Sequence, residues 1–135
     1  MALFILKGKK KMDINLLMKI RYDKGDNSKK FQKLLRKIKP FSKIDMDEDI
    51  PLTKLEKLVR MYIVKYNLYI GSISENIVFD NYYSAWVGKN VVSEKRGREN
   101  VFLNSIEAWS IYEVFVKICI LFYWEVENDE EIVKR

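Results

Sequence analysis

Histidine is absent from this 135-residue sequence, and cysteine occurs only once. Without histidine, the chain lacks the side chain most often used as a general base and as a metal ligand, and every catalytic triad that depends on histidine is excluded. The single cysteine, Cys119, excludes an intramolecular disulfide and any cysteine-rich metal centre. Because Cys119 stands within an apolar run, we expect it to be a core residue.

Motifs that mark common active sites are also missing. Neither G-x-x-x-x-G-K-[ST] nor G-x-G-x-x-G occurs, and no serine stands in a G-x-S-x-G setting. The acids Asp45, Asp47, Glu48 and Asp49 cluster, but they lack the glycine-bearing spacing of a calcium loop, so a solvated connector is the favoured interpretation. We therefore expect a non-enzymatic protein with no catalytic residue, no metal and no cofactor.

Long apolar runs are absent too. The run Ile118–Trp124 is closed by Lys117 and Glu125, and it is far shorter than the roughly 18 uncharged residues of a membrane-spanning helix. At the N-terminus the apolar residues precede the charged ones, which is the reverse of a secretory signal. These features predict an intracellular, cytoplasmic protein without a membrane segment.

The composition is that of one globular domain spanning residues 1–135, with 48% hydrophobic and 33% charged residues and only two prolines and five glycines. The net charge of +6 is unevenly distributed. Residues 1–43 hold 14 Lys and Arg against three Asp, whereas residues 44–135 hold 11 Lys and Arg against 16 acids. A basic front suits a polyanion such as nucleic acid, and a solvated lysine-rich face is the alternative.

The N-terminal part is predicted to contain strands. Residues 12–22 alternate apolar and polar side chains, which favours a half-buried strand. A helix would group Ile14, Leu17 and Met18, which is the weaker match. A second short strand is expected at 2–6.

Three helices are predicted in the middle of the chain. Ser28 precedes a helix over 29–39 with one apolar stripe, and an acidic connector, 44–52, follows it. Thr53 has the spacing of a capping box at the start of the next helix, 53–70. A second capping box precedes residues 73–87, and each of these two segments is followed by glycine. They form a helix-turn-helix-like pair.

The remaining elements are a hairpin and a long helix. Residues 88–104 indicate a β-hairpin with the charged tip KRGR, and a plain loop is the alternative. Residues 105–126 favour a helix, in which Glu113 and Lys117 form an i, i+4 ion pair. A strand remains open there, because alternate positions are apolar. The tail 127–135 is expected to be solvated. The predicted class is mainly α with a minor β component (α+β), with the body at 53–126.

This order of elements resembles the winged helix-turn-helix superfamily. The most similar stretch is SENIVFDNYYSAWVGKNVVSEKRGRENVFL, which looks like a recognition helix running into a wing. The resemblance implies DNA binding through residues 73–87 and through Lys89, Lys95, Arg96 and Arg98 on the wing. The segment 73–87 departs from the superfamily because it contains no Lys or Arg.

A fainter resemblance is to the small helical subunit of type III CRISPR effector complexes. It is carried, in order, by the segments LTKLEKL, YYSAWVGK and IYEVFVK. Such subunits bind along RNA–protein filaments and are not enzymes. This resemblance implies a helical protein-interaction module in a ribonucleoprotein.

The sequence therefore predicts a small basic nucleic-acid-binding protein, a regulator or accessory factor, with DNA favoured over RNA. The predicted nucleic-acid-binding residues are Lys29, Lys30, Lys33, Arg36, Lys37, Lys89, Lys95, Arg96 and Arg98. The alternative is a helical protein-interaction module, either a ribonucleoprotein subunit or a small inhibitor from a virus or mobile element.

A protein interface is predicted on the last helix. From Ile118 to Trp124 a helix would be apolar on every side, and a small domain hardly covers every side of a helix. The expected contact residues are Ile118, Leu121, Phe122 and Trp124. We expect them to bury a second copy of the chain or another protein.

Overall fold

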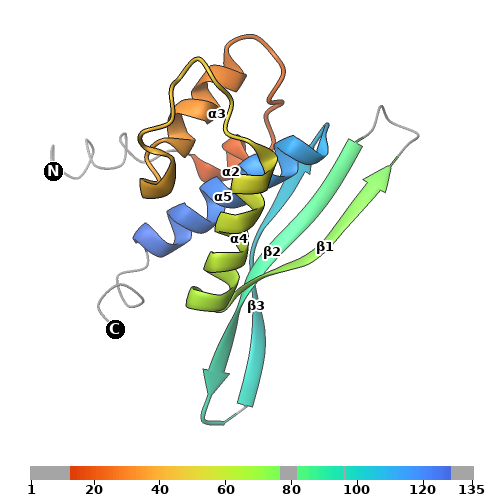
Figure 1. Cartoon of the computed structure of the whole chain (residues 1–135). Helices are drawn as coiled ribbons and strands as arrows, with labels where there is room; N and C mark the ends of the chain where they lie inside the picture. Colours follow the sequence, from red (N-terminus) through yellow and green to blue (C-terminus); the bar gives the residue numbers. More distant parts are fainter. Residues whose placement is uncertain (1–12, 77–81, 96, 129–135) are drawn as a thin grey trace, which may run out of the picture.

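A computed structural model describes residues 13–76, 82–95 and 97–128 of the chain (Figure 1). In chain order the elements are α2 (Ile14–Leu17), α3 (Asn27–Leu35), the 3-10 helix η1 (Lys39–Phe41), α4 (Leu52–Tyr66), β1 (Leu68–Asn76), β2 (Tyr82–Ser93), β3 (Gly97–Ala108) and α5 (Ile111–Asn128). The α+β class is confirmed. Strands nevertheless occupy much more of the chain than the sequence predicts.

The three strands form one antiparallel sheet in the order β1-β2-β3. Figure 1 shows the helices gathered on one side of this sheet, with the β2–β3 hairpin extending beyond them. None of the described helices covers the opposite side, which we call the open face. An antiparallel sheet can leave one face exposed in this way.

The core lies between the sheet and the helices. Helix α5 packs against β2 and β3 on one side and against α3 and α4 on the other. The buried residues on the covered face of the sheet are Leu68, Ala85, Val87, Ile106 and Ala108. Phe41 and Ile50 of the connecting segment belong to the same core, so the described residues form one packed unit.

Helix α4 follows the predicted periodicity but not the predicted ends. Leu55, Leu58 and Tyr62 are buried at helical spacing. The helix begins after Pro51 without a side-chain cap, so the expected capping box is not formed. It ends at Asn67, which has a φ of 56° in the left-handed region.

The strand predicted over residues 12–22 is wrong. Leu16 N donates a hydrogen bond to Asp13 Oδ1 at 3.1 Å, and this cap starts the short helix α2. Leu17 and Met18 are both buried. In a half-buried strand, two adjacent side chains would point to opposite faces and only one of them would be buried. The strand expected at 2–6 lies outside the described residues.

Helix α3 is confirmed with shifted ends. It covers Asn27–Leu35 rather than 29–39, so Ser28 lies inside the helix and is not its cap. Phe31 and Leu35 are buried, as the apolar stripe predicts. The chain then turns through η1 into the connector.

The helix predicted over 73–87 is also wrong, since its described residues lie in β1 and β2. Ala85 and Val87 are buried while Ser84 and Trp86 are exposed, which is the two-residue period of a strand. The described residues of 53–70 and 73–87 therefore do not form the predicted helix-turn-helix pair. The β2–β3 hairpin is confirmed and is longer than predicted.

Helix α5 settles the choice between helix and strand over 113–126. It begins at Ile111 rather than at residue 105, because residues 105–108 belong to β3. Its Glu113 Oε2 lies 2.7 Å from Lys117 Nζ, which confirms the predicted i, i+4 pair. Among the described helices, none combines the length and the apolar character that a membrane span requires.

Candidate nucleic-acid interface

Around Gly88, the open face carries one aromatic side chain from each strand. Tyr69 of β1 and Phe102 of β3 both pair with Gly88 of β2, and Trp86 lies two residues before that glycine. Residues two apart in a strand share a face, so the three rings lie together. Trp86 is 37% exposed and Phe102 is 60% exposed. We call Tyr69, Trp86 and Phe102 the aromatic platform.

Two glycines provide the space beneath these rings. A β-carbon at Gly71 would lie 2.1, 2.2 and 2.3 Å from Cε2, Cζ2 and Cδ2 of Trp86. Because these distances are nearly equal, the indole turns a face toward Gly71 and the other face away from the sheet. A β-carbon at Gly88 would lie 2.7 Å from the hydroxyl oxygen of Tyr69. Glycine inside a strand often marks such a close approach.

The rings of the platform are arranged as a surface with one upright neighbour. The planes of Trp86 and Phe102 are inclined by only 32°, with centroids 6.4 Å apart. Tyr69 meets Trp86 edge-on, at 86° and 5.7 Å. Trp86 and Phe102 therefore present their faces in a similar direction, while Tyr69 flanks the indole.

The surroundings of the platform are polar and carry little charge. Ser72 and Ser105 pair with Trp86 across the sheet. Asn90 pairs with Asn100 one step farther toward the hairpin tip. These side chains can hydrogen-bond a ligand without carrying charge of their own.

Among the described strand residues, Glu107 is the one acid at an open-face position. The Tyr82 hydroxyl donates a hydrogen bond to Glu107 Oε1 at 2.7 Å. Burial and this hydrogen bond raise the pKa of Tyr82 to about 12, so the hydroxyl keeps its proton at neutral pH. Glu107 therefore has a fixed partner on the open face.

The hairpin brings part of the predicted basic set close to the platform. Arg98 pairs with Val92 and lies on the same face as Phe102, four residues away along β3. Lys95 lies in the turn at the tip, and Arg96 lies outside the described residues. Lys89 points to the covered face, where its Nζ lies 3.7 Å from Glu125 Oε1.

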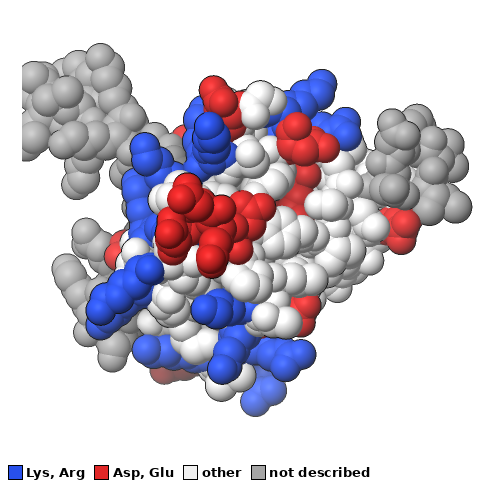
Figure 2. Space-filling model, turned by 45° about the horizontal axis from the view of Figure 1, so that its top comes forward, with Lys and Arg blue, Asp and Glu red and all other residues white. Residues whose placement is uncertain are grey.

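The lysines of α3 lie elsewhere, on the helical side. Lys29, Lys30 and Lys33 line a pocket of about 600 Å³ together with Asp26 and Asp47. These carboxylates offset part of the lysine charge. Figure 2 shows the same mixture over this side of the molecule, where a compact acidic patch has Lys and Arg around it. Lys37 is exposed as well.

Arg36 has a different role from the predicted phosphate contact. Its Nε donates to the Ile44 carbonyl at 3.2 Å, and its Nη2 donates to the carbonyls of Asp45, at 2.7 Å, and Glu48. Its Nη1 donates to Gln32 Oε1 at 2.6 Å. The guanidinium therefore fastens the acidic connector to α3.

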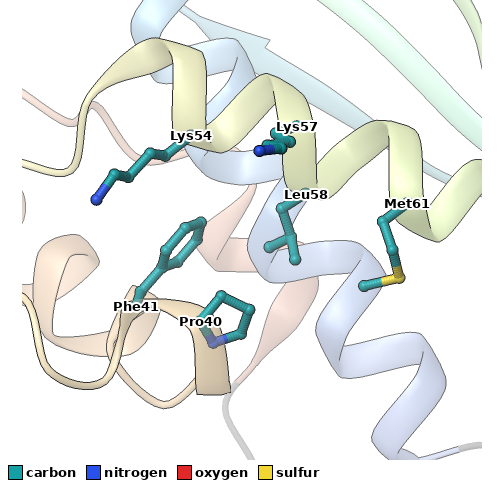
Figure 3. Close-up of a pocket in the computed structure, with 6 residues that line it drawn as sticks. All are labelled: Pro40, Phe41, Lys54, Lys57, Leu58 and Met61. Atoms are coloured by element: carbon teal, nitrogen blue, oxygen red, sulfur yellow. The ribbon is translucent and has the colours of Figure 1, made fainter.

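A shallow groove of about 420 Å³ lies between η1 and α4. Its floor is apolar, from Phe41, Leu58 and Met61, and Figure 3 shows Lys54 and Lys57 on α4 beside it. Such a groove suits an apolar group that carries negative charge. Nothing in it resembles the aromatic platform.

The most buried cation of the described chain is structural. Lys117 is fully buried, and its Nζ donates to the carbonyls of Met18 at 3.3 Å, Ile20 at 2.6 Å and Glu107 at 2.5 Å. Burial lowers the pKa of Lys117, and the neighbouring Glu113 opposes that shift. The ammonium thus joins α5 to the turn after α2 and to the end of β3.

The predicted interface on α5 is not accessible at most of its positions. Ile118, Leu121 and Phe122 are at most 2% exposed, and the chain itself covers them. Trp124 is partly exposed. The apolar run is therefore core, and no second chain is needed to bury it. Cys119 is buried in the same region, as predicted, with its Sγ 3.5 Å from the Leu55 carbonyl.

Sequence reasoning missed the aromatic platform. Gly71 and Gly88 were interpreted as helix ends, although glycine next to aromatic and β-branched residues is also the signal of a strand with a close contact.

Within the ranges described, no three His, Cys, Asp or Glu side chains gather as a metal site would require. Comparison of the chain with models of known families, with curated proteins and with solved structures finds no match.

Proposed function

We propose that the protein binds nucleic acid through the open face of its sheet. The observation that carries this proposal is the placement of Arg98 on the same face as the exposed rings of Trp86 and Phe102. Proteins that bind nucleic acid without a recognition helix commonly combine aromatic stacking with cations that follow the phosphates. The net charge of +6 favours a polyanionic ligand.

In this proposal the hairpin replaces the recognition helix that the sequence suggested. The platform contacts bases, and Arg98, together with Lys95 at the tip, contacts phosphates. Such a surface is compatible with a regulator or accessory role on DNA. It is equally compatible with a role as a subunit that contacts RNA. The lysines of α3 lie on the helical side of the molecule, away from the platform. In this proposal they contribute only long-range electrostatic attraction to the nucleic acid.

The proposal is tested by the salt dependence and the location of binding. Affinity for a fluorescently labelled oligonucleotide should fall linearly on a plot of log K against log salt. The charge-reversal variant Lys95→Glu/Arg98→Glu should lose about tenfold or more in affinity at low salt, because two phosphate contacts become repulsive.

Two matched variants carry the same change in net charge. Lys39→Glu/Lys43→Glu reverses two exposed lysines of the η1 region, and it should retain most of the affinity. Lys29→Glu/Lys33→Glu tests the helix that the sequence favoured. Equal losses in all three variants would show that binding is not located on the hairpin, and absent binding at low salt would refute the function itself.

A further inference from the structure

The orientation of the platform rings points to a narrower class of ligand. The indole of Trp86 lies against Gly71, and the ring of Phe102 is inclined to it by 32°. Both rings therefore lie along the sheet and turn a face outward. They do not project from the surface as an intercalating wedge does.

We propose that this platform selects single-stranded nucleic acid by stacking unpaired bases on Trp86 and Phe102. The inference rests on the proposed function and names the substrate class of the same site. In a duplex each base face is covered by the neighbouring base pair, and only edges and backbone are accessible. Rings that lie flat on a sheet reach base faces only when the bases are unpaired.

The residues around the platform fit this ligand. Ser72, Ser105 and the pair Asn90 and Asn100 offer uncharged hydrogen-bonding groups beside the rings, where base edges and sugars would lie. Arg98 lies on the same face, four residues from Phe102 along β3. It is suited to contact a phosphate of the nucleic-acid strand whose bases stack on the platform. Glu107, the one acid at an open-face position among the described strand residues, is engaged with Tyr82.

A neutral polysaccharide is the competing occupant, because sugar rings also stack on aromatic side chains. The charges favour the nucleic acid. Arg98 lies on the same face, four residues from Phe102, and Lys95 lies in the turn at the hairpin tip, and neither has a role toward an uncharged ligand. Competition with a neutral polysaccharide is therefore one arm of the test.

The experiment measures fluorescence anisotropy with one labelled oligonucleotide, as a single strand of DNA, as the RNA of the same sequence, and as the blunt duplex. We expect the single strands to bind about tenfold or more tightly than the duplex. Phe102→Ala should weaken single-strand binding about tenfold and leave duplex binding nearly unchanged. Phe102 is 60% exposed, so this variant is expected to fold. Trp86→Phe, which keeps a ring, should retain more affinity than Trp86→Ala.

The matched control is Val92→Ala, which removes an apolar side chain that is 77% exposed on the same face without removing a ring. It should leave all affinities within about twofold. Equal affinity for strand and duplex, together with no effect of Phe102→Ala, would overturn the single-strand inference and leave the proposed function standing. Displacement of the strand by dextran would also overturn it. If no nucleic acid binds, both the single-strand inference and the proposed function are refuted.

Discussion

The indole of Trp86 turns one face toward Gly71, so closely that a β-carbon at position 71 would lie 2.1 Å from the indole Cε2. The lack of a side chain on β1 and the orientation of the indole on β2 thus depend on each other. The absence of a side chain at one position sets the orientation of the aromatic surface at the other. This relationship makes the platform testable at a residue that itself contacts no ligand.

We expect Gly71→Ala to tilt the indole away from the sheet. The new methyl group cannot be accommodated beside the ring, and overpacking of this kind typically lowers stability by about 1–3 kcal/mol. The measurements are the near-ultraviolet circular dichroism of the tryptophans and the affinity for a single-stranded oligonucleotide, both of which should decrease. Ser74→Ala, at an exposed position of the same strand, should change neither. Unchanged affinity in Gly71→Ala would mean that the flat orientation of Trp86 is unimportant.

The buried ammonium of Lys117 should be essential for stability. Lys117→Met leaves the Glu113 carboxylate without its partner at 2.7 Å and removes one hydrogen-bond donor from each of three backbone carbonyls. Removal of one member of a buried pair lowers the free energy of unfolding by about 3–5 kcal/mol. Urea denaturation measures this change, and Lys24→Met at an exposed lysine provides the control.

Glu113 supplies the second half of the same test. The double variant Glu113→Gln/Lys117→Met should lose less stability than the sum of the single variants, because it no longer buries an unpaired carboxylate. Strict additivity would show that the two side chains do not act on each other.

Stability should fall at alkaline pH, and Tyr112 contributes to this loss. Its hydroxyl accepts a hydrogen bond from Gln32 Nε2 at 2.8 Å and donates one to the Ile50 carbonyl at 2.5 Å. Burial raises the pKa of Tyr112 to about 12, whereas an unfolded tyrosine titrates near pH 10. Between about pH 10 and 12 the folded state therefore keeps a proton that the unfolded state loses, and the free energy of unfolding decreases as pH rises.

Tyr112→Phe should reduce that alkaline slope. At neutral pH the variant should be less stable by about 1–3 kcal/mol, since Gln32 Nε2 loses one of its two acceptors and the Ile50 carbonyl loses the hydroxyl donor. Urea denaturation of wild type and variant at a series of pH values measures both effects. Parallel curves from pH 9 to 12 would contradict the assignment to Tyr112.

Arg36 should matter for the connector rather than for ligand binding. Arg36→Lys keeps the charge but cannot reach the carbonyls of Ile44, Asp45 and Glu48 together. We expect a lower Tm and faster proteolysis within the connector, with oligonucleotide affinity nearly unchanged. Lys37→Arg, a change between the same two residue types at an exposed position, should have neither effect. A large loss of affinity in Arg36→Lys would restore the phosphate contact that the sequence suggested.

The elements that the sequence predicted well have local signals. Helices α3, α4 and α5 carry apolar residues at helical spacing, and the i, i+4 pair of Glu113 and Lys117 forms as expected. In the hairpin, β-prone residues flank a charged turn with glycine at position 97, where φ is +69°. These patterns depend on residues close in sequence.

The failures occur where distant residues decide. The capping-box spacing before residues 73–87 is fortuitous, because residues 73–76 pair with residues 82–85 of β2, and β2 pairs in turn with β3, which comes later in the chain. The apolar run in α5 looked like an interface, yet the sheet and the other helices cover it on opposite sides. Arg36 looked like a surface cation, and only the folded connector shows its partners.

The most direct test of the open face uses Trp86 as the reporter. The chain has three tryptophans, so a Trp109→Phe/Trp124→Phe protein leaves Trp86 as the single emitter. Titrated with an unlabelled single-stranded oligonucleotide at low salt, its fluorescence should be quenched to saturation, and the midpoint should move to higher concentration as salt is added. Emission that stays constant while anisotropy shows the strand to be bound would contradict stacking on the platform.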